Sequence, residues 1–223
     1  MSHSSSLAGI GMTSRRTRAR MIDRLRAKGI VDETVLAAMN AVPRHIFVEE
    51  ALASRAYEDT ALPLGFAQTI SQPYTVARML EILLNGRKSL GKTLEVGAGC
   101  GYQTAVLAHF CRAVYAVERI EPLLARARRN LEQLPDIPAR LHLEHSDGSL
   151  GLSKSAPFDS IIVAAAAAAV PQDLLRQLAP DGILVLPVGG DEQYLYRIER
   201  KLQGFVETRL ESVRFVPLIA GLE

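Results

Sequence analysis

The sequence predicts an α/β protein with a doubly wound, mostly parallel sheet. Two observations lead to this fold class. From Lys92 onward, short apolar runs typical of strands alternate with amphipathic runs typical of helices, at the spacing of βαβ units. The chain then ends in two segments that alternate apolar and polar residues around Gly204, which is the pattern of an antiparallel hairpin at the edge of a sheet.

The first third of the chain is predicted to be helical, with a polar interruption. Seven Arg or Lys residues between Thr13 and Gly29 surround an apolar stripe, and Gly29 is a helix stop. A second helix is expected over residues 32–40. A turn-rich connection over residues 56–73 follows, and apolar residues at three- and four-residue spacing over 76–83 predict a third helix.

The remainder of the chain supplies the sheet. Strands are predicted where apolar residues run together or alternate, and helices where their spacing becomes three or four residues. The predicted strands lie within residues 92–101, 113–119, 139–148, 158–167, 182–189, 193–201 and 205–218. The helices between them cover residues 102–110, 120–134 and 170–180, and Pro122 suits the first turn of the second one.

Composition limits the class of protein. A chain of 223 residues fits one domain and can bury roughly 70–75% of its unfolded surface without a disulfide or metal staple. A net charge of +2 with 22% charged residues indicates an ordinary globular protein rather than a polyelectrolyte binder. Two cysteines, Cys100 and Cys111, make no disulfide framework, which favours a reducing, cytoplasmic compartment.

The amino-terminal residues carry no recognisable targeting signal. Residues 1–12 lack the basic start and apolar core of a signal peptide, so we expect a flexible tail, with Met12 as an alternative start. The longest apolar run, residues 161–170, is too short to cross a bilayer. We therefore expect no membrane association.

A glycine loop follows the first predicted strand of the sheet. Gly97, Gly99 and Gly101 stand at even spacing, whereas the dinucleotide fingerprint needs its third glycine one residue later, where Tyr102 stands. This spacing counts against NAD or FAD. The small residues of the loop still let a ligand approach the backbone, and Glu95 just before it can accept a hydrogen bond from an ammonium group. A nucleoside that bears an amino acid fits such a loop better than a pyrophosphate does.

Two acidic residues stand at the ends of the next two strands. Glu118 ends the second strand, where a carboxylate can accept both ribose hydroxyls. Asp147, followed by Gly148, ends the third, where a carboxylate can meet an adenine amino group. A glycine loop alone is weak support, because tight turns also use glycine. The loop together with both acids predicts a site for S-adenosylmethionine.

Several other kinds of site fit less well. After the fourth strand, alanines at 164–169 replace the Asn- or Asp-Pro-Pro-aromatic tetrad of nucleic-acid amino-group methyltransferases and the carboxylates of metal-dependent ones. His109, His142 and His145 have no ligand spacing, so no metal is expected. Cys100 is interpreted as a small loop residue, because methyl transfer needs no covalent enzyme intermediate.

Seven segments of the chain carry a resemblance to a known family. They are VPRHIFV, AYEDTALPLG, QTISQPYTVARM, LEVGAGCGYQTAVLA, VERIEPL, APFDSIIV and VRFVPL. Together they closely resemble the protein-L-isoaspartate O-methyltransferase family, from about Arg18 to Leu218. The resemblance implies a Rossmann-like methyltransferase sheet with extra amino-terminal helices. It also implies that S-adenosylmethionine is used to methylate the free α-carboxylate of isoaspartyl residues in damaged proteins and peptides.

The predicted organisation is a tail followed by one methyltransferase domain. The tail is residues 1–12 and the domain residues 13–223. Within the domain we expect an amino-terminal helical extension on the substrate side, a cofactor-binding core and the final antiparallel strands. These parts cover residues 13–72, 73–190 and 191–223.

The resemblance also assigns site residues. Ser71 falls on the family's active-site serine, and Thr69, Ile70 and Val216 are assigned to substrate binding. The residues assigned to the cofactor are Glu95, Gly97, Ala98, Gly99, Cys100, Gly101, Glu118, Arg119, Asp147 and Gly148. Three departures from the family pattern occur: Ala67 where many relatives have glycine, HSDGS for the more usual Gly-Asp-Gly-Tyr, and the alanine tract for a Thr-Ala-Ala-like strand end.

Thr69, Ser71 and Gln72 form a polar segment without an acid, a base or a thiol. A substrate carboxylate with a reference pKa of roughly 3.5 is already ionised at neutral pH and needs no general base. Hydroxyl and backbone N–H donors that align it with the S–CH₃ axis suit the task. The alternative interpretation is that Ser71 only caps the helix that begins near Pro73.

The leading prediction is therefore an enzyme that acts on isoaspartyl proteins and peptides as a monomer. Two alternatives stay open: a methyltransferase that binds RNA through the basic amino-terminal helix, and a nucleoside-binding module without catalysis. No aromatic residues interleave the charges of that helix, which favours a solvated face over a nucleic-acid site.

Overall fold

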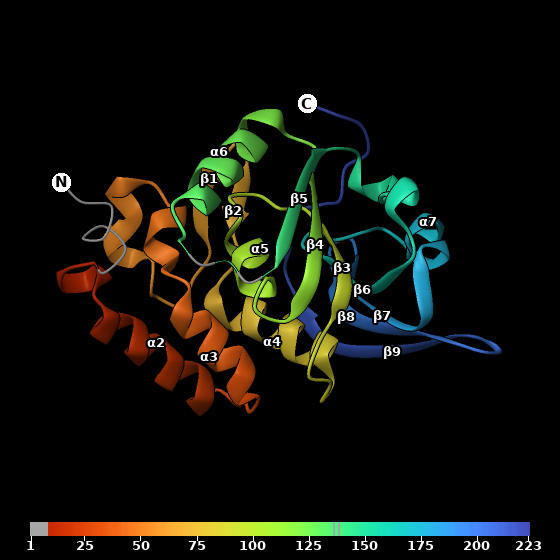
Figure 1. The fold of residues 1–223 in the computed structure, drawn as a ribbon, viewed down its shortest axis with the longest axis horizontal. Helices are drawn as coiled ribbons and strands as arrows, with labels where there is room; N and C mark the ends of the chain where they lie inside the picture. The colour runs from red at the N-terminus through yellow and green to blue at the C-terminus, as the bar shows by residue number, and fades with distance from the viewer. Residues whose placement is uncertain (1–8, 136, 138) are drawn as a thin grey trace.

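The computed structural model describes residues 9–135, 137 and 139–223 and confirms the predicted fold class. Seven strands form one sheet in the order β5-β4-β3-β6-β7-β8-β9, in which β8 and β9 run antiparallel to their neighbours and the rest are parallel (Figure 1). The strands are β3 (Gly91–Val96), β4 (Cys111–Glu118), β5 (Arg140–His145), β6 (Phe158–Val163), β7 (Leu178–Gly189), β8 (Gln193–Lys201) and β9 (Gly204–Val213). The predicted hairpin thus closes one edge of the sheet.

Helices pack on both faces of the sheet. The α-helices are α2 (Arg15–Ala27), α3 (Glu33–Ala41), α4 (Pro73–Leu84), α5 (Tyr102–Leu107), α6 (Glu121–Glu132) and α7 (Gln172–Arg176). Short 3₁₀ turns are η1 (Gly11–Thr13), η2 (Arg44–Phe47), η3 (Glu50–Arg55), η4 (Gly148–Leu150) and η5 (Ser153–Ser155). Along β7, Ile183 and Val185 join the larger core cluster with α2 to α6, whereas Leu184 and Leu186 join the smaller one with α7. This alternation is the period of two that a strand imposes.

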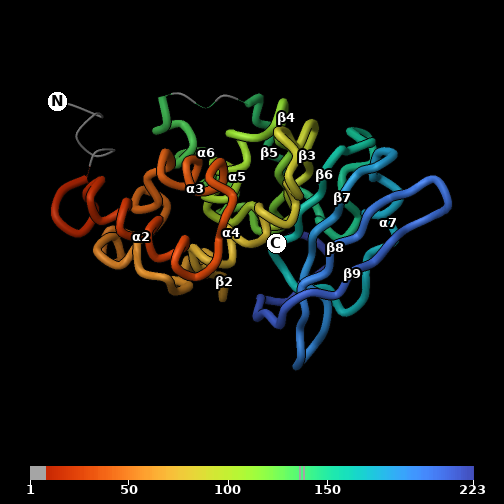
Figure 2. The backbone as a smooth tube through the Cα atoms, turned by 90° about the horizontal axis from the view of Figure 1, so that it is seen from below, coloured from red at the N-terminus to blue at the C-terminus, as the bar shows by residue number. Residues whose placement is uncertain are grey.

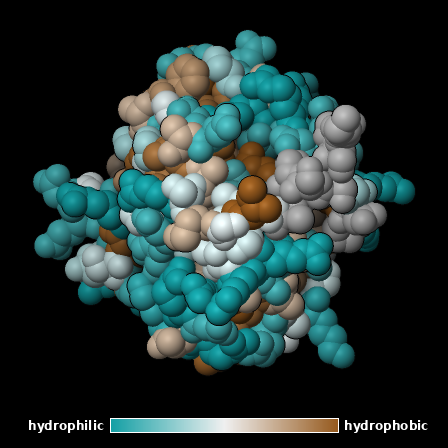
Figure 3. Space-filling view, turned by 90° about the vertical axis from the view of Figure 1, so that its left-hand side faces the viewer, coloured by the Kyte–Doolittle hydropathy of each residue, from teal (hydrophilic) through white to brown (hydrophobic). Residues whose placement is uncertain are grey.

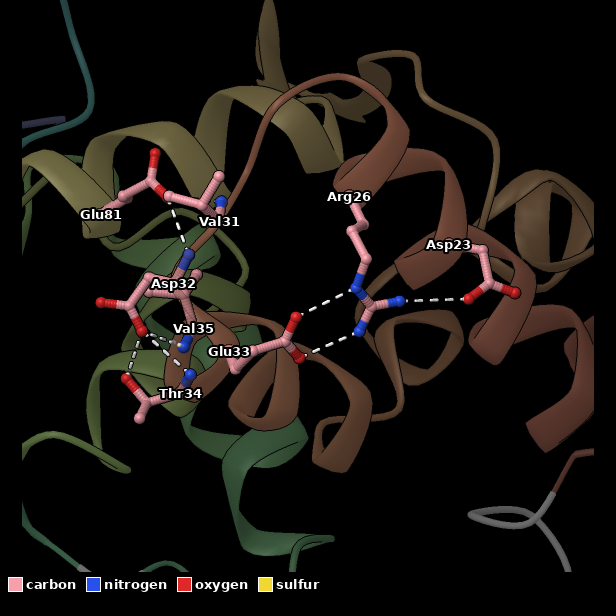
Figure 4. Close-up of polar contacts among 8 residues, drawn as sticks. All are labelled: Asp23, Arg26, Val31, Asp32, Glu33, Thr34, Val35 and Glu81. Atoms are coloured by element: carbon pink, nitrogen blue, oxygen red, sulfur yellow. Dashed lines mark hydrogen bonds and ion pairs between the residues drawn. The ribbon is translucent and has the colours of Figure 1, made fainter.

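The amino-terminal helices are attached to the core by polar contacts as well as by packing. Glu81 of α4 accepts hydrogen bonds at Oε1 from the backbone N–H groups of Val31 and Asp32, at 2.8 and 2.9 Å (Figure 4). Asp32 in turn caps α3, and Arg26 of α2 reaches both oxygens of Glu33, at 3.0 and 2.9 Å. α2 and α3 lie at one end of the molecule, opposite the turn between β8 and β9 (Figures 1 and 2).

Two basic residues of α2 and its C-cap residue Lys28 bind within the chain. Arg18 donates to the carbonyl oxygen of Ala41, Arg24 to that of Tyr57, and Lys28 Nζ lies 2.5 Å from Asp59. The face of the molecule at this end is mostly hydrophilic, with smaller hydrophobic areas between (Figure 3). These contacts attach α2 and the residue after it to neighbouring segments of the chain.

A short hairpin stands where only a turn-rich connection was predicted. β1 (Leu62–Gly65) pairs antiparallel with β2 (Gln68–Ile70), and the two residues between them, Phe66 and Ala67, both have φ of 53°. Two-residue turns with positive φ at both positions usually have Asn-Gly or another glycine-containing sequence. Phe-Ala gives no such signal, so the prediction missed the hairpin. The same geometry explains why glycine suits position 67.

Several predicted boundaries are wrong, and two of them show the reason. The last strand ends at Val213, not at residue 218, and the following segment leaves the sheet to bind Ala166, whose N–H donates to the Val216 carbonyl oxygen at 2.8 Å. The helix predicted over 170–180 ends at Arg176, because Leu178 already pairs with Phe158 of β6. Both errors arise from pairings between distant residues.

Of the predicted tail, residues 1–8 lie outside the described residues. The Ile10 N–H donates to the Thr13 hydroxyl at 3.0 Å, so the described structure begins just before η1.

Candidate active site

A cavity of about 90 Å³, which we call the loop cavity, lies at the carboxyl ends of β3, β4 and β6. The direction of strand addition reverses between β3 and β6, and ligands of open α/β sheets bind at such a point. The predicted site residues that line it are Thr69, Ile70, Ser71, Gly97, Ala98, Gly99, Cys100, Glu118, Arg119, Gly148 and Val216. Glu95, Gly101 and Asp147 lie outside its wall.

The glycine loop adopts backbone conformations that favour glycine. Gly97, Gly99 and Gly101 have φ of 87°, 54° and 88°, all in the left-handed region. A Cβ at Gly101 would lie 3.3 Å from side-chain atoms of Ala127 and Leu131. Gly101 therefore serves the packing of the loop on α6, whereas Gly97 and Gly99 face the cavity.

Glu118 joins the loop to the end of β4. It is 6% exposed; Oε2 accepts a hydrogen bond from the Gly99 N–H at 2.8 Å, and Oε1 one from the Ile120 N–H at 3.0 Å. A carboxylate has about four acceptor positions, so both oxygens keep acceptor capacity. The predicted ribose acceptor thus also fixes the conformation of the loop.

Glu95 is wholly buried behind the loop cavity. Oε1 accepts from Gln103 Nε2 at 3.1 Å, and Oε2 accepts from the Thr104 hydroxyl at 2.5 Å. Burial raises the pKa of Glu95 to about 8, although both hydrogen bonds act in the opposite direction. Gln103, which no sequence pattern selects, lines the cavity, and Glu95 orients it.

The carboxyl-terminal residues reach the predicted adenine contact. Asp147 Oδ1 accepts from the Ser149 N–H at 2.9 Å and the Ser149 hydroxyl at 2.6 Å, and Oδ2 accepts from the Gly221 N–H at 2.6 Å. Partial burial acts against ionisation, but these hydrogen bonds hold the pKa of Asp147 below its usual value. An adenine group at Asp147 would share a carboxylate that already binds the chain's own backbone.

Arg119 holds the same carboxyl-terminal segment. Nη1 lies 2.9 Å from Glu223 Oε2, Nε donates to the Gly221 carbonyl oxygen at 3.2 Å, and the Glu223 N–H donates to the Arg119 carbonyl oxygen at 2.8 Å. Leu218 and Ile219 of this segment line the loop cavity. The partners stand 102 and 104 positions apart, so no local sequence signal could have indicated them.

A second cavity, of about 550 Å³, is lined by α4 and by the edge strands β8 and β9, and we call it the edge cavity. Thr69, Ser71, Ala164 and Val216 line both cavities. The predicted substrate residues Thr69, Ser71 and Val216 therefore stand where the two cavities meet. Ile70 is 4% exposed and lines the loop cavity alone.

Ser71 does not cap α4. The N-cap position is Gln72, and the Tyr74 N–H of the first turn donates to Asp59 Oδ1 at 2.8 Å. Within the described residues, the Ser71 hydroxyl takes part in none of the hydrogen bonds found. The capping interpretation is therefore wrong, and the hydroxyl is available to a ligand.

The ionisable acids around Ser71 are carboxylates: Glu118 lines the loop cavity, and Asp191, Glu192 and Glu211 line the edge cavity. Among the described residues that line the two cavities, none is a histidine or a lysine. In the described part of the chain, no three His, Cys, Asp or Glu side chains come together as metal ligands would. Burial raises the pKa of the Cys100 thiol, which fits a small loop residue better than a nucleophile.

This sheet, with its glycine loop and the acid at the end of the next strand, defines the class of Rossmann-like methyltransferases. The profile of the Protein-L-isoaspartate(D-aspartate) O-methyltransferase family matches residues 16–223. The chain belongs to that family, as the sequence predicted.

Relatives and solved structures agree with this membership. The chain is 69% identical to a Protein-L-isoaspartate O-methyltransferase from Dechloromonas aromatica, over 97% of this chain and all of that one. It is 61% identical to one from Azoarcus sp. (strain BH72), over 93% of this chain and 95% of that one. A candidate enzyme of the same kind from Plasmodium falciparum, solved with S-adenosyl-L-homocysteine, superposes with a TM-score of 0.79 at 27% identity, covering 91% of this chain and 98% of that one.

Proposed function

We propose that the chain transfers a methyl group from S-adenosylmethionine to the free α-carboxylate of L-isoaspartyl residues in proteins and peptides. The observation that carries this proposal is the position of Thr69, Ser71 and Val216, which line both cavities. A cofactor in the loop cavity and a carboxylate in the edge cavity would meet at these residues.

The residues of the loop cavity suit such a cofactor. Glu118 offers acceptor capacity to ribose hydroxyls, and the glycine loop lets a ligand approach the backbone at Gly97 and Gly99. Gln103, fixed by Glu95, offers a polar side chain at the end where an amino-acid group would lie. Arg119 and Gly148 complete the wall near Asp147.

The reaction needs alignment rather than proton transfer. S-adenosylmethionine supplies a methyl group on a sulfonium centre. A carboxylate oxygen forms the new O–CH₃ bond as the S–CH₃ bond breaks, and no proton moves. The Ser71 hydroxyl and the Gln72 N–H, which has no acceptor within the described residues, can hold the carboxylate without a full charge that would quench it. Positioning of this kind can be worth roughly 7–11 kcal/mol.

The product explains a role in repair. A methyl ester is a better acyl donor than a carboxylate, so the backbone nitrogen of the next residue can displace methoxide and close a succinimide. Water then opens the ring, and part of the product is the normal aspartyl peptide. An extended peptide is the expected substrate, and the segment around Val216 forms one wall of the edge cavity.

The proposal includes a cytoplasmic monomer that binds neither nucleic acid nor membrane. Within the described chain, both cysteines are free thiols and no helix has the length and apolar character to span a bilayer. The internal contacts of Arg18, Arg24 and Lys28 reduce the cationic surface that an RNA-binding α2 would need.

Methyl transfer from labelled S-adenosylmethionine tests the proposal. The acceptors are an isoaspartyl peptide, the same peptide with normal aspartate, and an unstructured RNA, each with and without chelator. We expect label only in the isoaspartyl peptide, at an unchanged rate with chelator. Label in RNA, equal label in the two peptides, or loss of activity with chelator would contradict it.

A further inference from the structure

Arg44 is a buried cation behind the proposed methyl-transfer point. It is 0% exposed and lines neither cavity. Nε donates to the carbonyl oxygen of Ala56 at 2.9 Å, and Nη2 donates to the carbonyl oxygen of Ser71 at 2.8 Å. Its guanidinium carbon lies 4.7 Å from the ring centroid of Tyr102. One side chain thus connects the residue after η3, the residue after β2 and the first residue of α5.

Burying the guanidinium of Arg44 without an ion-pair partner lowers the stability of the fold, so stability does not explain why a cation stands here. Among the described residues no carboxylate forms an ion pair with Arg44, and Nη1 is buried without a hydrogen-bond partner. Burial lowers the pKa of Arg44 from its usual value, since the charged form is poorly solvated there. Apolar side chains of similar volume often replace buried charges without loss of stability. A role in the adjacent site would explain why a charged residue stands at this position.

The geometry of one peptide unit indicates that role. The Ser71 carbonyl and the Gln72 N–H belong to the same planar trans peptide and point in opposite directions. Because Arg44 holds the carbonyl oxygen, it fixes the N–H on the other side of that plane. Gln72 lines the edge cavity, and its N–H has no acceptor within the described residues. A charged donor at the carbonyl also polarises the unit and strengthens the N–H as a donor.

We propose that Arg44 is a positioning residue for methyl transfer: it fixes the Ser71–Gln72 peptide so that the Ser71 hydroxyl and the Gln72 N–H face the substrate carboxylate. The buried charge also attracts that carboxylate from a position where it cannot form a direct ion pair and quench it. This inference rests on the proposed function.

Variants of Arg44 and a matched control test the proposal. Arg87 is the control, because its Nη2 and Nε donate to the carbonyl oxygens of Leu83 and Leu84, at 2.7 and 3.3 Å, at the opposite end of α4. It lines neither cavity. The proteins compared are the unmodified chain, Arg44→Met, Arg44→Lys and Arg87→Met. At 15 °C, active sites are counted by S-adenosyl-L-homocysteine binding, and kcat and KM are measured with an isoaspartyl peptide.

We expect Arg44→Met to lower kcat per binding site by about ten- to a hundredfold, with less change in KM and less than threefold change in S-adenosyl-L-homocysteine affinity. Arg44→Lys should recover part of the loss, since it keeps the charge but cannot bind both carbonyls. Arg87→Met should have a lower melting temperature than the unmodified chain, and its kcat should stay within twofold of the unmodified value.

Three results would overturn the inference. They are an Arg44→Met kcat within twofold of the unmodified chain, an equal loss in Arg87→Met, or no S-adenosyl-L-homocysteine binding by either Arg44 variant, which would assign Arg44 to folding. An inactive unmodified chain would instead refute the proposed function, so the two failures are distinguishable.

Discussion

Replacing Glu118 with alanine should weaken the binding of S-adenosyl-L-homocysteine and loosen the glycine loop. Charge-assisted hydrogen bonds to ribose hydroxyls are worth about 1.5–3 kcal/mol, which is roughly a 10- to 150-fold increase in Kd. The Gly99 and Ile120 N–H groups, now bound at 2.8 and 3.0 Å, lose their acceptor as well. The loss of this acceptor should also lower the unfolding free energy by about 1–3 kcal/mol, and water that enters the vacated space limits the loss.

Titration calorimetry and chemical denaturation on the same protein separate these two effects. Glu121→Ala is the control, because it removes the same charge from an exposed position three residues further on, in the first turn of α6. It should leave Kd within twofold. If Glu118→Ala binds S-adenosyl-L-homocysteine as tightly as the unmodified chain, the assignment of the ribose end of the cofactor to β4 is refuted.

Two further predictions concern stability. Burial raises the pKa of Glu95 to about 8, above the ordinary value of 4.5, so the folded chain holds a proton that the unfolded chain has lost between these values. Stability should therefore fall as pH rises from about 4.5 through 8, by an amount on the order of a few kcal/mol, and Glu95→Gln should flatten that slope in denaturation curves between pH 5 and 9. Glu81→Ala leaves the Val31 and Asp32 N–H groups without their acceptor and should cost about 1–3 kcal/mol, whereas Arg26→Ala, in an exposed ion pair, should cost less than about 1 kcal/mol. Equal melting temperatures for these two variants would contradict the attachment of α3 to α4 by Glu81.

The order and type of the main elements were predictable because each repeats a local pattern. The apolar run before the glycine loop predicts β3, the segment with Pro122 in its first turn predicts α6, and the alternation of apolar and polar residues predicts β8 and β9; all these elements are present. Prediction failed where a turn lacks its usual local signal and where the outcome depended on distant pairing. The Phe66–Ala67 turn carries no glycine, and β7 starts early because Leu178 meets Phe158.

The candidate site also combines features that the local sequence predicts with contacts that it does not. Glycines and acids at strand ends are readable because parallel strands present their carboxyl ends at one edge. The bonds from Gly221 to Asp147 and from Arg44 to Ser71 join segments 74 and 27 positions apart, and nothing in the local sequence encodes them. The resemblance to a family predicts Ser71 as the active-site serine, and the structure adds that Ser71 lines both cavities.

Ser71→Ala is the measurement that tests the central claim most directly, namely that an ionised carboxylate is aligned without a base. Ser212→Ala, which also changes a serine of the edge cavity but away from the junction, is the control. We predict that Ser71→Ala lowers kcat/KM for the isoaspartyl peptide by about ten- to a hundredfold, or about 1.4–2.7 kcal/mol, with cofactor affinity and melting temperature nearly unchanged. Full kcat/KM with a lowered melting temperature would contradict the claim.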